Sequence, residues 1–341
     1  MRCLVTGGAG FIGSHAVQRL LGDGHEVLAI DDLGRGHAEA IELLQKDAGG
    51  RLRFERCSIQ DADRLGQIVP AFAPDAVLHF AALAYVGESV QIPGRYWAVN
   101  VLGMLTLLRA CEGVERFVFS SSCATYGQPP EGMIPVPESC PQSPVSPYGR
   151  TKLVGEWMLE DLVRARVIAG DRFGVAMLRY FNVAGADRSG LLGEDHDPET
   201  HLIPLAIDAA LGRREALTIF GTDYPTPDGT CVRDYVHVED LVDAHVAALG
   251  AIRPGEALAY NVGVGRGYSV REVVETVGRV VGRPVPVVEG ARREGDPPML
   301  YAEAGKIERE LGWRARALEL EEIVADAAAW RTRHPGGYAG G

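Results

Sequence analysis

The first half of the chain alternates short apolar runs with longer segments of helical pattern. The apolar runs typical of buried strands are "RCLVTG", "EVLAIDD", "LRFERCSI", "AVLHFAA" and "RFVFSSS". Between them lie amphipathic segments, one beginning at Ser14 and another running through "VNVLGMLTLLRACEG". This alternation predicts right-handed βαβ units and an α/β fold in which helices cover both faces of a doubly wound parallel sheet.

The pattern loosens after "FGVAMLRYFNVAG", because Gly-, Pro- and Asp-rich loops occupy residues around 187–204 and 221–233. We therefore expect two domains, residues 1–182 and a smaller α/β domain at 183–341. Strand and helix patterns return in "VRDYVHVEDLVDAHVAAL" and "AYNVGVG", so segments around 233–263 are expected to rejoin the first domain. The terminal "HPGGYAGG" has the composition of a frayed tail.

Composition indicates an ordinary globular protein of 341 residues, with 46% hydrophobic and 23% charged residues. The net charge of −12 argues against a nucleic-acid or anionic membrane surface. No apolar run approaches the ~18 residues of a membrane span, and a strand at the very start leaves no room for a signal peptide. Six scattered cysteines form no C-x-x-C, which predicts neither disulfides nor a metal site and favours the cytoplasm.

A glycine-rich turn connects the first strand to the first helix. In "LVTGGAGFIGSH", Gly8, Gly10 and Gly13 fit G-x-G-x-x-G, and Gly7, Gly10 and Gly13 fit the looser G-x-x-G-x-x-G. Residues without Cβ let backbone N–H groups approach a pyrophosphate. Asp31, at the end of the second strand, is placed to bind the ribose hydroxyls of NAD and to repel the 2′-phosphate of NADP. The sequence therefore predicts a Rossmann-like sheet with NAD as cofactor, against the alternative of a tight turn that merely caps a helix.

A tyrosine and a lysine stand one helical turn apart in "SPYGRTK", as Tyr148 and Lys152. This spacing puts both on one helical face, where an ammonium stabilises a phenolate and lowers its pKa. Ser122 follows the strand "RFVFSSS" at the edge of the sheet where open α/β folds bind ligands. We interpret Tyr148 as a general base assisted by Lys152 and Ser122. The alternatives are an ordinary Tyr–Lys pair on a helix surface and a serine that only hydrogen-bonds the backbone of the turn.

With these residues the chain resembles the extended short-chain dehydrogenase/reductase family and, within it, the UDP-glucose 4-epimerases. The resemblance covers nearly the whole chain, and its most specific segments are "TPDGTCVRDYVHV" and "RREGD". It implies NAD-dependent C4 epimerisation of a UDP-sugar, first of all UDP-glucose and UDP-galactose, through a transient 4-keto sugar. In the family, NAD takes the C4 hydride, the tyrosine takes the hydroxyl proton, and the sugar turns to receive the hydride on its other face.

The resemblance also implies the residues of both sites. For NAD they are Gly7, Gly10, Phe11, Ile12, Gly13, Asp31, Asp32, Ser58, Ile59, Phe80, Ala81, Ala82, Asn100, Ser120, Tyr148, Lys152 and Tyr180. For the UDP-sugar they are Ser122, Tyr148, Phe181, Asn182, His201, Leu202, Phe220, Arg233, Tyr235, Arg293, Asp296 and Leu300. By the same resemblance, Tyr180 and Phe181 flank the nicotinamide, and Phe220 and Tyr235 border the uracil and ribose.

Two arginines in an acidic chain suit the diphosphate on chemical grounds as well. Arg233 and Arg293 carry guanidinium groups that bind phosphate in a bidentate manner. Ion pairing within "VRD" and "RREGD" is the alternative explanation of their position.

Several positions depart from the family pattern. Ser58 stands where the family often has an acidic residue, and Ala84 where it has a lysine, which predicts weaker retention of NAD. "SSSCATYG" and "ALAYVGES" resemble the UDP-xylose (UDP-arabinose) 4-epimerase branch. Leu300 falls at the position that gauges bulk at C2 of the sugar, so the exact UDP-sugar stays open.

Two other functions are compatible with the same fold. A sugar-nucleotide 4,6-dehydratase needs an acidic pair just after the strand-end serine, where this chain has Cys123 and Ala124. A non-catalytic NAD-sensing protein on the same fold is a different class, disfavoured by the intact Tyr148, Lys152 and Ser122.

The family resemblance further implies a homodimer joined through two helices, around 98–112 and 150–163. These segments carry more apolar residues than one helical face packed against the sheet needs. Burial of all of them in the core is the alternative explanation. They are Val101, Leu105, Leu108, Leu153, Trp157 and Leu162.

Overall fold

The computed structural model describes residues 1–293 and 295–340. The chain forms two compact units: unit 1 holds Met1–Tyr126, Gln142–Arg179 and Val242–Tyr260, and unit 2 holds Gly127–Pro141, Tyr180–Leu241 and the chain from Asn261 on. The division at 179/180 lies close to the predicted one at 182/183. The structure differs in assigning 127–141 to unit 2, and it limits the returning segment to 242–260.

Unit 1 is built on a seven-stranded sheet. The last residues of β6 and β10 are assigned to unit 2. The strand order is β10-β6-β5-β4-β1-β2-β3, and the pairs from β6 to β3 are parallel. The doubly wound Rossmann-like fold is therefore confirmed. The strands are β1 (Arg2–Thr6), β2 (Glu26–Asp31), β3 (Leu52–Arg56), β4 (Ala76–His79), β5 (Arg116–Ser120), β6 (Gly174–Tyr180) and β10 (Ala257–Val262).

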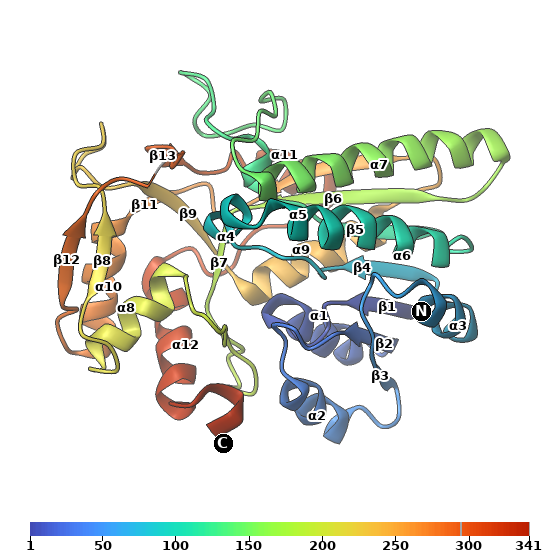
Figure 1. Ribbon diagram of the computed structural model, residues 1–341, viewed down its shortest axis with the longest axis horizontal. Helices are drawn as coiled ribbons and strands as arrows, with labels where there is room; N and C mark the ends of the chain where they lie inside the picture. Colours follow the sequence, from blue (N-terminus) through green and yellow to red (C-terminus); the bar gives the residue numbers. More distant parts are fainter. Residues whose placement is uncertain (294, 341) are drawn as a thin grey trace. The chain divides into compact units, whose positions relative to one another are not determined.

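Helices cover both faces of this sheet (Figure 1). One face packs α3, α6 and α7 into an apolar core with the strands, and α1 and α9 are joined by an ion pair between Arg19 and Asp243. The helical segments are α1 (Phe11–Gly22), α2 (Ala38–Asp47), α3 (Ala62–Phe72), α4 (Val86–Gln91), α5 (Pro93–Tyr96), the π-helix η1 (Trp97–Gly103), α6 (Met104–Ala110), the 3₁₀-helix η2 (Cys123–Thr125), α7 (Pro147–Ala169) and α9 (Val238–Ala251).

The starts of two helices show how the sequence sets the site. The first helix begins at Phe11 rather than at the expected Ser14, because Gly10 is its N-cap and the Ser14 N–H already donates to the Gly10 carbonyl at 2.9 Å. Helix α7 begins at Pro147 after Ser146, whose Oγ accepts from the Gly149 N–H at 3.1 Å. A serine N-cap followed by proline is a strong start signal.

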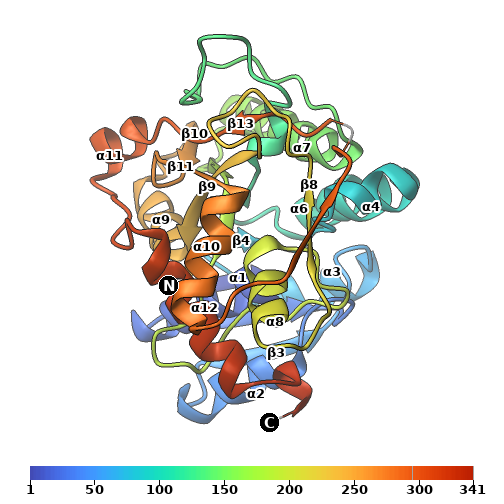
Figure 2. The same cartoon turned by 90° about the vertical axis from the view of Figure 1, so that its left-hand side faces the viewer.

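Unit 2 combines short strands with a layer of helices. β9 pairs with β7, β11 and β13, and β8 pairs with β12. Figure 2 shows α8, α10 and α12 side by side, and they share an apolar core. The elements are β7 (Asn182–Ala184), α8 (Leu202–Ala210), β8 (Leu217–Phe220), β9 (Val232–His237), β11 (Gly267–Ser269), α10 (Val270–Val281), β12 (Val287–Gly290), β13 (Met299–Leu300), α11 (Gly305–Leu311), α12 (Leu320–Arg333) and η3 (Gly337–Gly340).

The end of the chain is attached, and the expectation of a frayed tail is wrong for Tyr338. Its hydroxyl accepts from the Gly193 N–H at 3.0 Å, and its ring lies 5.2 Å from that of Trp330. Its own N–H donates to Asp195 at 2.9 Å. One aromatic side chain therefore docks a segment whose glycine content indicates disorder.

The apolar positions of the two predicted dimer helices divide into different groups. Leu108 and Leu153 are buried, so for them the core explanation holds. Leu105 and Trp157 are 37% and 54% exposed, and neighbouring Leu102 is 55% exposed.

The described residues include no helix long and apolar enough to cross a membrane. All six cysteines are unbridged and buried.

Candidate active site

Tyr148 and Lys152 lie on the first turns of α7 and face the interior of unit 1. Only 6% of Tyr148 and 3% of Lys152 is exposed. The Lys152 Nζ donates to the Ser120 carbonyl at 2.7 Å and lies 5.9 Å from the centre of the Tyr148 ring. Burial lowers the pKa of Lys152 to about 7, although the Glu156 carboxylate opposes this shift. An ammonium with so little water around it is stabilised by a neighbouring anion.

The segment that follows Ser122 packs against the same helical turn. It follows β5, and its Oγ accepts from the Ala124 N–H at 3.1 Å. A Cβ added at Gly149 would lie 2.5 Å from the Ala124 carbonyl oxygen, so the close approach of η2 to α7 requires glycine there. The structure thus brings the segments of Tyr148, Lys152 and Ser122 together in unit 1.

A buried ion pair anchors α7 one turn beyond Lys152. The Glu156 carboxylate, 1% exposed, faces the Arg179 guanidinium of β6 in a two-pronged contact, with Nη2–Oε2 at 2.6 Å and Nε–Oε1 at 2.9 Å. Ser121 and Gln142 donate to the same carboxylate at 2.5 and 2.9 Å. The sequence analysis missed this network, although a glutamate four residues after Lys152 on a buried helical face was a usable signal.

The glycine turn has the geometry of an anion site. Gly7 has φ +71°, and a Cβ there would lie 2.6 Å from the Ala81 nitrogen. Gly10, the N-cap of α1, has no side chain to occupy the N–H groups of the first turn, and that turn carries no carboxylate. These N–H groups and the positive end of the helix dipole therefore fit a pyrophosphate.

Asp31 ends β2 beside this turn. Its Oδ2 accepts from the Ala9 N–H at 3.0 Å and its Oδ1 from the Leu33 N–H at 2.8 Å. Burial raises the pKa of this carboxyl, and the two backbone donors oppose the shift. The carboxylate is thus fixed where a ribose attached to the pyrophosphate is expected.

The Asn100 side chain makes its hydrogen bonds with other residues of the protein. Its amide exchanges hydrogen bonds with the Leu83 backbone at 2.8 and 2.9 Å and donates to Thr151 at 3.0 Å. It therefore connects the loop after β4 to α7, a supporting position for a cofactor rather than a free donor. Ser120, another predicted NAD residue of unit 1, is the last residue of β5. The others lie on α1 or just after β2, β3 and β4: Phe11, Ile12, Gly13, Asp32, Ser58, Ile59, Phe80, Ala81 and Ala82. Tyr180 and Phe181 belong to unit 2.

In unit 2, four predicted substrate residues lie on paired strands. Asn182 of β7 pairs with Tyr235 of β9, and Leu300 of β13 pairs with Arg233 of β9. Tyr235 is buried in the core of the unit, and burial raises its pKa to about 12. Its ring therefore packs in the core of the unit, and its role beside uracil or ribose stays a prediction.

Arginines gather at a pocket of unit 2. The Arg293 guanidinium lies 4.0 Å over the Phe220 ring, and Arg233 lies 3.5 Å from Asp296. The pocket is lined by Gln128, Tyr224, Arg292, Arg293, Gly295, Asp296 and Pro298. Its chemistry suits an anionic ligand with an aromatic ring. Arg292 and Tyr224 are additions that the sequence analysis did not single out.

His201 and Leu202 lie at the start of α8, where His201 is the N-cap. The His201 imidazole makes no capping bond and faces carboxylates instead, with Nδ1 at 2.9 Å from Glu199 and 3.0 Å from Glu194. Its side chain is therefore engaged within unit 2.

The chain is similar to known proteins over nearly its full length. Residues 3–263 match the NAD dependent epimerase/dehydratase family. The UDP-glucose 4-epimerase of Rhizobium meliloti is 45% identical over 333 residues, 97% of each chain. That of Streptomyces lividans is 46% identical over 339 residues, 98% of this chain and 97% of its own.

Solved structures of UDP-glucose 4-epimerases have the same fold. UDP-glucose-4-epimerase from Stenotrophomonas maltophila, with bound NAD and formylated UDP-arabinopyranose, has a TM-score of 0.91 at 40% identity, covering 98% of this chain and 99% of the other. The Bifidobacterium longum enzyme, in complex with NAD+ and UDP, has a TM-score of 0.93 at 38% identity, covering 99% and 100%. With its parallel sheet, glycine turn and Tyr148–Lys152 pair, the chain belongs to the NAD-dependent epimerase/dehydratase family, in which its relatives are UDP-glucose 4-epimerases.

Proposed function

We propose that this protein catalyses the NAD-dependent C4 epimerisation of a UDP-sugar, UDP-glucose and UDP-galactose first, through a transient 4-keto sugar. The observation that carries the proposal is the buried Tyr148–Lys152 pair, with Ser122 on the segment packed against it. The UDP-xylose/UDP-arabinose pair is the second candidate, supported by the arabinose nucleotide bound in one similar structure.

NAD, when bound, supplies the acceptor and then the donor of the C4 hydride. Tyr148 removes the proton of the 4-hydroxyl and returns it after the sugar has turned. Lys152 stabilises the Tyr148 phenolate, because its ammonium is held nearby in a poorly solvated position. Ser122 hydrogen-bonds the reacting oxygen.

The residues of unit 2 hold the nucleotide part of the substrate. Arg233 and Arg293 bind the diphosphate, and Phe220 offers a ring face to the uracil. Asp296 accepts from a ribose hydroxyl, and Asn182, Phe181 and Leu202 contact the sugar nucleotide.

A panel of UDP-sugars tests the function directly. We expect the purified protein to interconvert UDP-glucose and UDP-galactose, as measured by chromatography of the products. Turnover of the pentose pair alone would move the function to the second candidate. Binding of NAD without inversion of any UDP-sugar would identify the NAD-sensing class instead.

Cofactor choice follows from Asp31. Two unit charges 4 Å apart repel by about 4 kcal/mol at an effective dielectric constant of about 20, so we expect NAD to bind on the order of 10²-fold or more tightly than NADP. Asp31→Asn should narrow this preference, while Asp23→Asn, at the exposed end of α1, should not. The measurement is the dissociation constants of NAD and NADP on cofactor-free protein. Equal affinities for the two in the unmodified protein would contradict the role of Asp31.

Substrate size follows from Leu300, which is 7% exposed beside Arg233. Extra bulk in a packed pocket costs about 1–3 kcal/mol, or roughly 5- to 150-fold in kcat/KM. We expect UDP-glucose to react faster than UDP-N-acetylglucosamine by such a factor, and Leu300→Ser to reduce it. The neighbouring Met299→Ser is the control, and equal rates in the unmodified protein would refute the steric argument.

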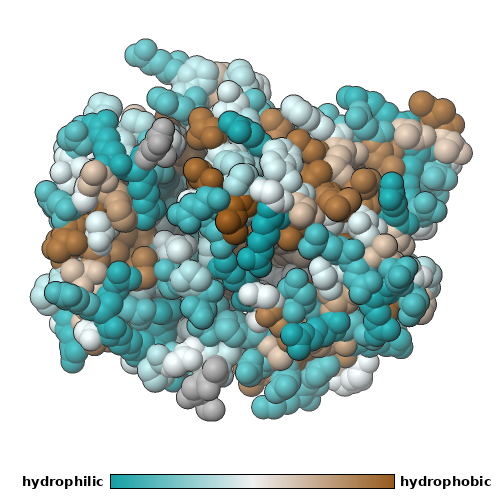
Figure 3. Space-filling view, in the orientation of Figure 1, coloured by the Kyte–Doolittle hydropathy of each residue, from teal (hydrophilic) through white to brown (hydrophobic). Residues whose placement is uncertain are grey.

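We propose that the protein is a homodimer and that exposed apolar side chains of η1, α6 and α7 form its interface. Leu102, Leu105 and Trp157 are exposed, and Figure 3 shows hydrophobic surface over the region of these helices. Burying such a patch against a second copy removes it from water. Sedimentation at micromolar concentration should give about twice 36.6 kDa, and a monomer alone would refute the pairing.

A further inference from the structure

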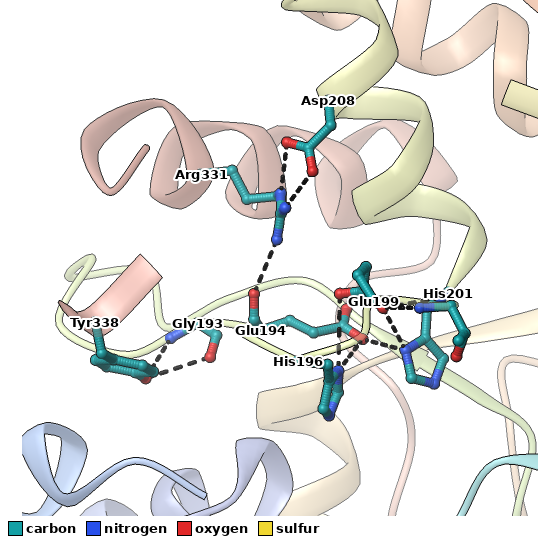
Figure 4. Close-up of polar contacts among 9 residues, drawn as sticks. Gly193, Glu194, His196, Glu199, His201, Asp208, Arg331 and Tyr338 are labelled. Carbon is teal, nitrogen blue, oxygen red and sulfur yellow. Dashed lines mark hydrogen bonds and ion pairs between the residues drawn. The ribbon is translucent and has the colours of Figure 1, made fainter. Parts of the chain in front are cut away.

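Four potential metal ligands converge in the loop before α8. They come from a stretch of eight residues, "EDHDPETH", and are Glu194, His196, Glu199 and His201. Figure 4 shows their side chains pointing toward one another. One donor atom from each residue lies within 4.8 Å of the other three.

The distances fit a single ion. The His201 Nδ1 lies 3.0 Å from Oε1 of Glu194 and 2.9 Å from Oε1 of Glu199. The His196 Nδ1 lies 3.3 Å from Oε1 of Glu194 and 3.8 Å from Oε2 of Glu199. Bonds of about 2.1 Å to a tetrahedral ion place its ligand atoms about 3.4 Å apart, so this cluster closes around one ion with small side-chain shifts.

A buried carboxylate points to a cation independently of the clustering. Glu194 is 4% exposed, and its Oε2 has no hydrogen-bond partner among the residues that the structure describes. Glu199 also has a buried Oε2 without such a partner there. Buried anionic oxygens are stable when a cation or donors satisfy them. The partly exposed His201 leaves a route by which an ion can enter.

The loop around the cluster is braced from outside. The Glu194 carbonyl accepts from Arg331 at 3.2 Å, and Arg331 in turn pairs with Asp208 of α8 (Figure 4). The Gly193 backbone bonds to the Tyr338 hydroxyl. These contacts fix the backbone that carries the first of the four residues.

We propose that Glu194, His196, Glu199 and His201 bind one divalent transition-metal ion of the Zn²⁺ type, at a structural site that fixes the start of α8. Two imidazoles with two carboxylates suit Zn²⁺ better than Mg²⁺ or Ca²⁺, which prefer oxygen ligands alone. Two carboxylates and two neutral imidazoles also balance the charge of the ion. All four ligands lie within unit 2, and Tyr148 and Lys152 take no part.

Metal binding is tested on the full-length protein, prepared without a histidine tag and stripped with a chelator. Equilibrium dialysis with Zn²⁺ followed by elemental analysis should give one ion per chain. Co²⁺ in place of Zn²⁺ should give the visible absorption bands of a tetrahedral site. A thiolate charge-transfer band should be absent, because its presence would indicate that cysteines bind the ion. His196→Gln and Glu194→Gln should each weaken binding by at least about tenfold, and His25→Gln, in unit 1, should not.

A stability measurement keeps the test valid if a variant folds poorly. At a Zn²⁺ concentration about 100 times its Kd, the Tm of the unmodified protein should rise by about 4 °C, with less change in the two variants. Failure of the unmodified protein to bind stoichiometric Zn²⁺ at micromolar concentration would overturn the proposal, and so would undiminished binding in both variants. The cluster would then be an ion-pair network between carboxylates and protonated histidines.

Discussion

Tyr148→Phe will reduce turnover by about 10² to 10⁴, the usual contribution of general acid–base catalysis, without loss of the fold or of NAD. The substitution removes one oxygen and keeps the ring. That ring is buried with Leu83 and Tyr96 and stands edge-on to Tyr96 at 6.5 Å, so the packing at the start of α7 persists. Measurement of kcat with UDP-galactose, and of NAD bound after purification, separates the two effects.

Tyr268→Phe is the matched control, because it removes a hydroxyl that bonds to the Leu318 carbonyl at 3.3 Å in unit 2. We expect near-normal turnover from it. A Tyr148→Phe protein that keeps its turnover within a few-fold of the original would exclude Tyr148 as the base.

Glu156→Gln will destabilise the protein by about 3–5 kcal/mol, the typical effect of breaking a buried ion pair. The Arg179 guanidinium would stay in the interior with its charge uncompensated, since its own side chain is only 7% exposed. Chemical unfolding of the two proteins under the same conditions measures the difference.

Glu160→Gln, one turn further along α7, is the matched control. Glu160 pairs with Arg164 at 3.9 Å on the exposed side of the helix, where such pairs contribute about 0–1 kcal/mol. The double variant Glu156→Leu/Arg179→Met should recover much of the loss, because it removes both charges. Equal stability of the Glu156→Gln and Glu160→Gln proteins would show that the buried pair is not what anchors α7.

The sequence predicted best where local pattern and chemistry coincide. The alternation of strands and helices gave the parallel sheet, and the glycine turn and the Tyr148–Lys152 spacing lie where a strand or loop meets a helix. These features depend on neighbours within a few residues, and such neighbours are visible in the sequence.

Features that depend on partners distant in the chain were missed. Glu156 and Arg179 are 23 residues apart. The position of Glu156 on a buried helical face signals a buried charge, but nothing local identifies Arg179 of β6 as its partner. Tyr338 docks on Gly193, across 145 residues, so its glycine-rich surroundings gave the wrong expectation.

The three-part composition of unit 1 has a consequence for how the protein is made. Its sheet ends at β10, which pairs with β6, and both α9 from Val242 on and β10 are synthesised long after the first six strands. Until residue 260 has left the ribosome, the edge of β6 is open and the face that His245 and its neighbours cover is bare. An unpaired strand edge beside an apolar surface invites aggregation. A nascent chain that stalls in this interval therefore exposes the surface from which aggregation starts.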